Sequence, residues 1–191
     1  MIVLASQSPR RRELLERMGL EFSVIVANAD ETMNPAAPIE QEIERVSLRK
    51  AKAVQAQCSM EDVIIAADTM VCVDGQRLGK PRDEADALRM LRLLSGRCHQ
   101  VISGLCVMQG DRAETACVTT HLHFRPLHQE EILAYIATGE PMDKAGAYGI
   151  QGAAAIFADR LDGDYYNVMG LPVCTLTRLL RAFGVPVLGC Y

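Results

Sequence analysis

The first segment able to do chemistry is residues 6–12, Ser-Gln-Ser-Pro-Arg-Arg-Arg, which combines hydroxyl and guanidinium groups. It follows an apolar run at residues 2–5, and Ser8 before Pro9 is typical of a helix start. The N-terminus of a helix presents N–H groups at the positive end of its dipole, where anions bind. Guanidinium groups add charge-assisted hydrogen bonds to phosphate oxygens. The segment therefore indicates a phosphate site; the alternative is a solvated helix start.

Lys50 is the second candidate, because it falls on the apolar face of a helix expected from Ile39 to about Gln57. At about 100° per residue, that face also holds Ile39, Ile43, Val46, Ala53 and Val54. The opposite side carries Arg45, Arg49 and Lys52, which resemble ordinary surface charges. A lysine on a buried stripe is usually paired, since an unpaired buried charge is costly. We favour a lysine that faces a ligand over one that snorkels at the edge of the core.

Asp68 and Thr69 form the third candidate, directly after an expected buried strand at residues 63–67. Ligands of α/β sheets gather beyond the carboxyl ends of the strands. An aspartate there can bind a divalent ion or accept a proton from water, and Glu31 could be a partner carboxylate, since paired carboxylates commonly hold Mg²⁺. The alternative is an aspartate that forms a turn.

Other patterns are weaker or point away from known nucleotide folds. Gly146, Gly149 and Gly152 do not match the dinucleotide fingerprint, and the chain contains no P-loop sequence. His121 and His123 would share one face of a strand. Without a third ligand nearby they are better interpreted as surface histidines than as a metal pair.

The elements that position these residues alternate between strands and helices. Strands are expected at residues 2–5, 22–26, 63–67, 70–73, 101–108 and 115–124, with a turn at Asp74-Gly75. Helices are expected at residues 9–18, 39–57, 85–94, 129–137 and 172–183. The pattern predicts an α/β fold with a mixed sheet, because hairpins interrupt the alternation.

Composition limits the class of protein. A length of 191 residues suits one domain. Only 5% of the residues are aromatic, so we expect an aliphatic core. The net charge of −4 argues against nucleic acid as the main partner. Seven irregularly spaced cysteines suggest buried thiols in a reducing compartment, and Cys190 could react incidentally. The sequence lacks the pattern of a signal peptide or membrane span, so we expect a cytoplasmic protein without membrane contact.

Taken together, the motifs resemble the Maf nucleotide pyrophosphatases. They occur in family order from Met1 to about Arg181. They comprise Ser6-x-Ser8-Pro9-Arg10-Arg11, Ala29-Asp30-Glu31-Thr32, Lys50-Ala51, Ala67-Asp68-Thr69, Lys80-Pro81, Leu94-Ser95-Gly96, residues 143–152 and Asn167-x-x-Gly170-Leu171-Pro172. The resemblance implies one domain over residues 1–191, with a two-lobed α/β fold, an elongated mixed sheet flanked by helices and a central cleft, similar to the inosine triphosphate pyrophosphatases.

The same resemblance implies hydrolysis of nucleoside triphosphates between the α- and β-phosphates with a divalent cation, Mg²⁺, Mn²⁺ or Co²⁺. Asp68 would be the proton acceptor that activates water, and Glu31 would assist at the metal. The phosphates would be held by Ser8, Arg11, Lys50 and Lys80. Cations and the metal would neutralise the charge that develops on the leaving pyrophosphate.

Within the family, Arg10, Thr69 and Gln151 resemble the branch that acts on dTTP and UTP. An amide can pair with N3–H and a flanking carbonyl of uracil or thymine. One alternative is a pyrophosphatase for 7-methyl-GTP or for modified nucleotides in general. Another is a non-catalytic, nucleotide-binding regulator of septum formation, since the family is linked to cell-division arrest. A homodimer is also implied by resemblance.

Overall fold

The computed structural model describes residues 1–189, so Cys190 lies outside the described part of the chain. The strands are β1 (Ile2–Leu4), β2 (Phe22–Val24), β3 (Val63–Val73), β4 (Gln76–Leu78), β5 (Cys98–Gln109), β6 (Arg112–Phe124) and β7 (Ala158–Asp162). The α-helices are α1 (Pro9–Arg17), α2 (Ile39–Gln55), α3 (Glu84–Leu94), α4 (Gln129–Ala137), α5 (Tyr165–Met169) and α6 (Val173–Ala182). There are also three 3₁₀ helices, η1 (Glu140–Asp143), η2 (Ala145–Ala147) and η3 (Ala153–Phe157).

The seven strands form one mixed sheet in the order β2-β1-β3-β5-β6-β7, with β4 paired to β3. Strand β1 pairs in parallel with β2 and with β3, whereas β4 and β7 pair antiparallel with β3 and β6. The predicted α/β fold with a mixed sheet and flanking helices is therefore confirmed. The five expected helices are present, with ends shifted by up to two residues. Strand β4 is the second strand of the expected hairpin, for which no range was predicted, while β7 and α5 were not anticipated.

Strand β3 differs from the prediction in a way that matters for the site. Residues 63–67 and 70–73 belong to one continuous strand, so Asp68 and Thr69 lie inside it and not after it. Two half-buried polar residues do not end a strand whose backbone stays hydrogen-bonded to its neighbours. The turn that follows was predicted correctly: Val73 pairs with Gln76, and Asp74 and Gly75 have φ angles of 48° and 75°.

The chain divides into two compact units, which we describe separately. Unit 1 comprises Met1–Asp68, Ser103–Val118 and the chain from Gly170 onward. Unit 2 comprises Thr69–Ile102 and Thr119–Met169. Of the candidate residues, unit 1 holds Ser8, Arg10, Arg11, Glu31, Lys50 and Asp68, and unit 2 holds Thr69, Lys80 and Gln151.

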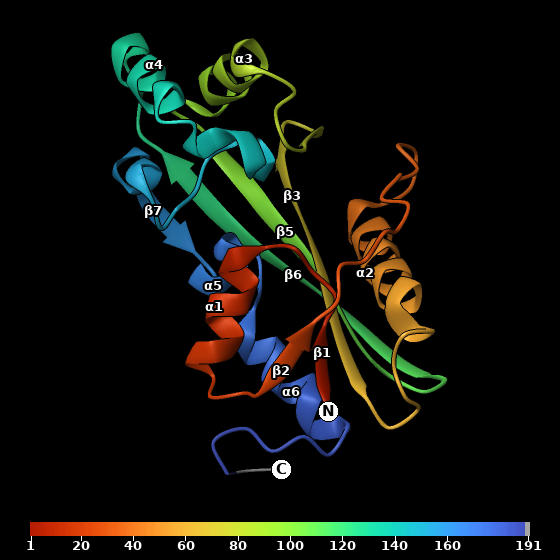
Figure 1. Ribbon diagram of the computed structural model, residues 1–191. Coiled ribbons are helices and arrows are strands. Elements are labelled where there is room, and N and C mark those ends of the chain that lie inside the picture. Colours follow the sequence, from red (N-terminus) through yellow and green to blue (C-terminus); the bar gives the residue numbers. More distant parts are fainter. Residues whose placement is uncertain (190–191) are drawn as a thin grey trace. The chain divides into compact units, whose positions relative to one another are not determined.

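The core of unit 1 is aliphatic, as the composition predicts. Helix α2 lies along strands β1 and β3 (Figure 1). Its buried face packs on them through small and branched side chains: Val3, Ala5, Ala51, Val54, Ile64, Ala66, Cys106 and Met108 form one cluster. The contact is close, because a Cβ atom built on Gly104 of β5 would lie 2.4 Å from the carbonyl oxygen of Ile43. Only glycine permits helix backbone and strand backbone to approach in this way.

The core of unit 2 adds a cluster of aromatic rings to the expected aliphatic side chains. Phe124 contacts His99, Tyr148 and Phe157 edge to face, with ring centroids 4.8–5.9 Å apart. Tyr135 packs against Phe157 at 5.3 Å in the same manner. Four of the nine Phe and Tyr residues thus gather in one cluster, which a composition averaged over the chain conceals.

The six cysteines within residues 1–189 are all free thiols. Only Cys72 and Cys106 are buried, while Cys98 and Cys174 are exposed, so the prediction that most would be buried is wrong. Within the described residues, no helix combines the length and apolar character needed to cross a membrane.

Candidate active site

The centre of the candidate site in unit 1 is the ammonium group of Lys50. Its Nζ lies 2.6 Å from Oδ1 of Asp68 and 2.9 Å from Oε1 of Glu31. The side chains of Lys50 and Asp68 are only 10% and 13% exposed, whereas that of Glu31 is 59% exposed. Two carboxylates therefore converge on one cation that is largely shielded from water, which strengthens their interaction.

Helix α2 places Lys50 as the periodicity predicts. The buried residues of the helix include Ile43, Val46 and Val54 together with Lys50. Ala53 was expected on this face but is exposed, because the buried stripe passes through Ala51. The snorkelling alternative fails, since the lysine head group meets carboxylates and not bulk solvent.

Arg49, next to Lys50, holds the segment that carries Glu31. Its guanidinium donates to the carbonyl oxygen of Thr32 at 2.6 Å and lies 3.3 Å from Oδ2 of Asp30. The backbone N–H of Thr32 also donates to Asp30, and the hydrogen bonds from Thr32 lower the pKa of Asp30. The interpretation of Arg49 as an ordinary surface charge is therefore wrong: it fixes the residues on both sides of Glu31.

Arg11 is buried, and the structure commits part of its guanidinium to the protein itself. It donates to the carbonyl oxygens of Gly170 and Ala67, both at 2.8 Å, and to Oγ of Ser6 at 3.3 Å. Burial lowers the pKa of Arg11, and the negative charge of Asp68 partly offsets this effect by raising the pKa. Arg11 thus connects helix α1 to the residue that precedes Asp68.

Ser6 belongs to the candidate segment at residues 6–12, and Gly170 belongs to a family motif, but neither was given a role as a partner of Arg11. The sequence does indicate that Arg11 is buried, because Arg11 lies three and four residues before Leu14 and Leu15 and so shares their buried stripe. A buried arginine requires acceptors. Their identity depends on segments distant in sequence, such as Gly170.

Ser8 occupies the N-cap position of α1, with Pro9 in the first turn, as predicted. Its backbone N–H donates to Oγ of Ser6 at 3.2 Å. Within residues 1–189, its hydroxyl makes no capping hydrogen bond, which corrects the expectation that this side chain caps the helix. Arg10, in the first turn of α1, is half-buried. The phosphate-binding role of Ser8 stays a prediction.

In unit 2, the segments that carry Lys80 and Gln151 are tied together. The N–H of Gly146 donates to the carbonyl oxygen of Gly79 at 3.0 Å, directly before Lys80. Gly146 has a φ of 71°, and a Cβ atom there would lie 2.9 Å from Val71 of β3. The glycine-rich loop therefore packs tightly on the strand that contains Thr69. Both Lys80 and Gln151 are exposed.

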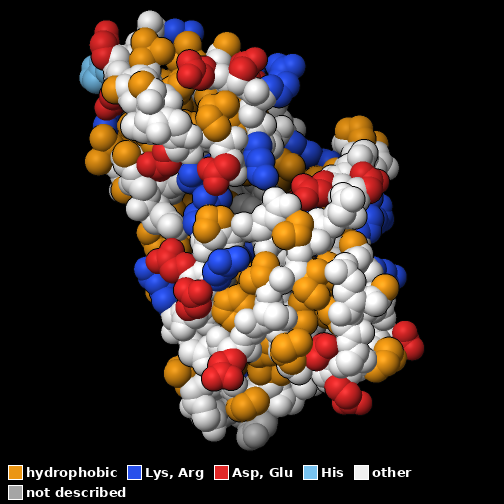
Figure 2. Space-filling view, in the orientation of Figure 1, with side chains coloured by type: hydrophobic (Ala, Val, Ile, Leu, Met, Phe, Trp, Pro, Cys, Tyr) orange, Lys and Arg blue, Asp and Glu red, His pale blue; other side chains and the backbone are white. Residues whose placement is uncertain are grey.

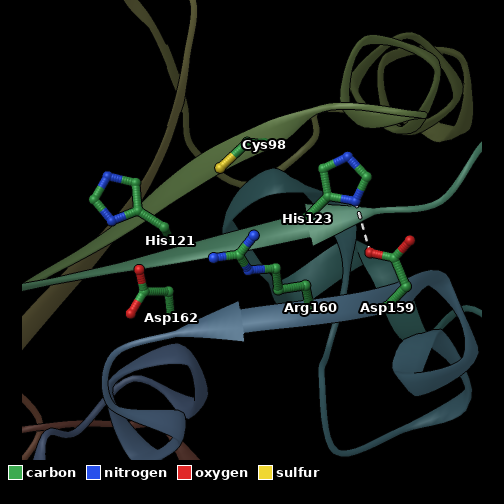
Figure 3. A pocket seen from close by; sticks show the side chains of 6 residues that line it. All are labelled: Cys98, His121, His123, Asp159, Arg160 and Asp162. Carbon is green, nitrogen blue, oxygen red and sulfur yellow. Dashed lines mark hydrogen bonds and ion pairs between the residues drawn. The ribbon is translucent and has the colours of Figure 1, made fainter.

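His121 and His123 lie on one face of β6, as predicted. They line a pocket with Cys98 of β5 and with Asp159, Arg160 and Asp162 of β7 (Figure 3). His123 is bound to Asp159 through Nδ1 at 2.6 Å, and His121 lies 3.2 Å from Nε2 of Gln100. Across residues 1–189, no group of three or more His, Cys, Asp and Glu side chains is placed to hold a metal ion. The alternative of a histidine metal pair therefore finds no support in the described structure.

Charge on the visible face of the molecule is mixed. Figure 2 shows Lys and Arg side chains interspersed with Asp and Glu side chains. A net charge of −4 adds no overall attraction for phosphate polymers. Attraction for a small anionic ligand would therefore depend on cations placed at the site itself, such as Lys50 and Arg11.

Comparison with known proteins assigns the chain to a family. The family model described as Maf-like protein matches residues 1–183. The chain belongs to the Maf family. A Maf-family assignment agrees with the motifs found in the sequence and covers both units.

Relatives of this Maf-family chain carry a specific name. A dTTP/UTP pyrophosphatase of Bacillus velezensis is 48% identical over 184 residues, covering 96% of this chain and 97% of the relative. One of Thermococcus gammatolerans is also 48% identical, covering 98% and 99% of the two chains. The solved structure of the Staphylococcus aureus Ham1 protein aligns with a TM-score of 0.51 at 15% identity, over 95% of this chain and 98% of that one. This last match shows a shared fold.

Proposed function

We propose that this chain hydrolyses dTTP and UTP to the nucleoside monophosphate and pyrophosphate. The names of relatives that are 48% identical over nearly the whole chain support this activity. The observation that carries the proposal is the Lys50–Asp68–Glu31 cluster, because it joins an acid–base group to a cation in a largely buried position.

In the proposed reaction, water cleaves the anhydride bond between the α- and β-phosphates. Asp68 accepts the proton of the attacking water, and the bond to the leaving pyrophosphate breaks. A lysine ammonium has three donors. Two of those of Lys50 reach Asp68 and Glu31, and the third can be donated to a phosphate oxygen. Charge that develops on the leaving group is thereby neutralised in a site of low dielectric constant.

The other cationic and hydroxyl groups have proposed roles in binding. Ser8 and the first turn of α1 would hold a phosphate through hydroxyl and backbone N–H groups. Arg11 would contribute its positive charge while its guanidinium braces the backbone at Ala67. Lys80 would bind the far end of the triphosphate chain.

A divalent cation fits the residues that are present. The Glu31 and Asp68 oxygens both contact Lys50 Nζ, so two hard carboxylate ligands lie close to one another. Mg²⁺ is commonly bound by one or two carboxylates together with phosphate oxygens and water, so these two residues would suffice alongside a substrate. When bound, Mg²⁺, Mn²⁺ or Co²⁺ would supply positive charge to the phosphates.

Base selection is proposed for Arg10, Thr69 and Gln151. The exposed amide of Gln151 can accept from N3–H through its oxygen and donate through its NH₂ group to a neighbouring carbonyl of uracil or thymine. We expect Gln151→Glu to lower activity on UTP and dTTP, because a carboxylate cannot donate. Unchanged turnover of both substrates would remove Gln151 from base selection.

The proposed activity is tested with a panel of triphosphates that includes dTTP, UTP, CTP, dATP, GTP and 7-methyl-GTP. Each is assayed with Mg²⁺, Mn²⁺ and Co²⁺, and products are identified as pyrophosphate or single phosphate. Pyrophosphate released fastest from dTTP and UTP supports the proposal. A preference for 7-methyl-GTP would favour the other branch, and release of single phosphate would contradict both.

We also propose a cytoplasmic homodimer. The free thiols within residues 1–189 are compatible with a reducing compartment. Sedimentation equilibrium tests the assembly, because a 20.9 kDa chain and its dimer differ twofold in mass.

A further inference from the structure

Gln151 lies in a tight turn of unit 2. The N–H of Gly152 donates to the carbonyl oxygen of Gly149 at 3.0 Å, so Ile150 and Gln151 are the two central residues of this turn. Ile150 is buried, whereas Gln151 is exposed. The position of the Gln151 amide therefore depends on how firmly both ends of the turn are held.

Both ends of the turn are tied to the carboxylate of Glu140. At the first end, the N–H of Gly149 donates to the hydroxyl of Tyr135 at 3.1 Å, and this hydroxyl donates to Oε1 of Glu140 at 3.0 Å. At the second end, the N–H of Ala153 donates to Oε2 of Glu140 at 3.1 Å. One carboxylate thus connects the residues on both sides of Gln151.

The glycines of the loop make room for this carboxylate. A Cβ atom on Gly152 would lie 2.0 Å from Oε1 of Glu140, and one on Gly149 would lie 3.2 Å from the same atom. A Cβ on Gly149 would also lie 2.7 Å from Cε of Lys144, whose Nζ donates to the carbonyl oxygen of Glu140 at 2.6 Å. The glycine spacing around Gln151 therefore has a physical reason, which is close packing around Glu140 and Lys144.

The supporting side chains are themselves fixed. Tyr135 is buried at 3% exposure and packs against Phe157, and burial raises the pKa of its hydroxyl. Tyr148, directly before Gly149, is held through its hydroxyl, which lies 2.8 Å from Nε2 of the buried His99. The carboxylate thus joins the turn to a rigid aromatic core.

We infer that Glu140, acting through Tyr135, is a positioning residue for the base-reading amide of Gln151. This inference rests on the proposed function, since it gives Gln151 the base contact. A carboxylate is suited to the task because it only accepts, and both ends of the turn supply donors. An amide at position 140 would place its NH₂ group against one of these donors, so one end of the turn would be released.

The test compares UTP with CTP, which differ at the edge of the base that the amide would read. The ratio of kcat/KM for the two substrates is measured for the wild type, Glu140→Gln, Tyr135→Phe and Gln151→Ala. We expect the ratio to fall about tenfold in Glu140→Gln and Tyr135→Phe, the size of one hydrogen bond to the base, mainly through a higher KM for UTP. Glu130→Gln makes the same chemical change at an exposed position of α4, the helix that carries Tyr135, so it is the matched control and should leave the ratio unchanged.

Coupling to Gln151 distinguishes positioning from general support of the fold. In the Gln151→Ala background, Glu140→Gln should not change the ratio further, because the amide that it positions is gone. A residue that merely stabilises the fold would lower the active fraction for both substrates equally, leaving KM and the ratio unchanged. Tyr135→Phe keeps the ring packing, so it provides the same test if Glu140→Gln does not fold.

The outcomes separate the inference from the proposed function. A reduced ratio in Gln151→Ala, with unchanged ratios in both Glu140→Gln and Tyr135→Phe, would overturn the inference and leave the function standing. An unchanged ratio in Gln151→Ala would overturn the base contact and the inference with it. A wild type that does not release pyrophosphate from UTP would overturn the function itself.

Discussion

At the scale of single residues, burial and charge act against each other at Lys50. Removing an ammonium group from water is costly, and the two carboxylates at 2.6 and 2.9 Å compensate for that cost. Asp68 is shielded almost as well as Lys50, whereas Glu31 is 59% exposed, so the pair of Lys50 and Asp68 is the one held away from water. The same pair that could catalyse the reaction therefore also affects stability.

We expect Lys50→Met to lower the free energy of unfolding by about 1–3 kcal/mol, because Asp68 would lose its charged partner while remaining largely buried. Urea denaturation followed by circular dichroism measures this loss. Lys52→Met is the control, since Lys52 is exposed on the same helix and its replacement should have little effect. Equal stability of the two variants would contradict the importance of the buried pair.

Asp68→Asn tests the proposed proton acceptor directly. An amide keeps the shape of the side chain but cannot take a proton from water, so we expect pyrophosphate release to fall by about 10²- to 10⁴-fold. Asp74→Asn serves as the control, because Asp74 lies in an exposed turn and asparagine tolerates its positive φ. Full activity of Asp68→Asn would remove Asp68 from the mechanism.

At the scale of elements, the close approach of α2 to β5 determines where the catalytic candidates lie. Gly104 of β5 sits against the carbonyl group of Ile43, which also accepts a hydrogen bond from Oγ of Ser47 at 2.9 Å. Helix α2 carries Lys50 and, through Arg49, holds the Glu31 segment. Packing at Gly104 therefore supports the site although it contains no reactive group.

Gly104→Ala should push α2 away from the sheet, because the added Cβ atom would lie 2.4 Å from backbone oxygen. We expect the free energy of unfolding to fall by about 1–3 kcal/mol, as for other overpacked cores. Gly79→Ala is the matched control, since a Cβ atom at Gly79 meets no other atom within 4 Å in the described structure. A Gly104→Ala variant as stable as the wild type would show that the helix can shift without cost.

At the scale of the whole molecule, stability should depend on pH through His99. Burial lowers the pKa of His99 to about 4 from an ordinary value of 6.5. Between these values the unfolded chain binds a proton that the folded chain does not, so stability falls as the pH drops from 6.5 towards 4. The stabilising contribution is fully present above pH 6.5.

Between pH 7.5 and pH 4.5, we expect the wild type to lose about 2–3 kcal/mol more stability than His99→Gln, which has no titrating ring. Urea denaturation of both proteins at the two pH values measures the difference, and the comparison cancels the contribution of the carboxylates. His121→Gln is the control, because His121 is exposed. An equal loss of stability in wild type and His99→Gln would contradict the buried, neutral imidazole.

The sequence by itself determined the features that depend on local patterns. Helical periodicity placed Lys50 on the buried face of α2, and turn chemistry located the bend at Asp74 and Gly75, because both signals lie within a few residues. The alternation of strands and helices predicted the α/β fold, and the family motifs added candidate residues such as Lys80 and Gln151. Local patterns failed at β3, where a polar pair resembled the end of a strand.

Only the tertiary structure decided which distant residues meet. Asp68 lies 18 positions from the lysine that it contacts, and Arg11 is held by carbonyl groups 56 and 159 positions away. Likewise, the glycines at positions 149 and 152 are explained only by the carboxylate of Glu140, which a Cβ atom at either position would approach too closely. Such contacts follow from the order and register of the strands and from the packing of helices on them. No local spacing of residues encodes that information, since many folds are compatible with the same local pattern.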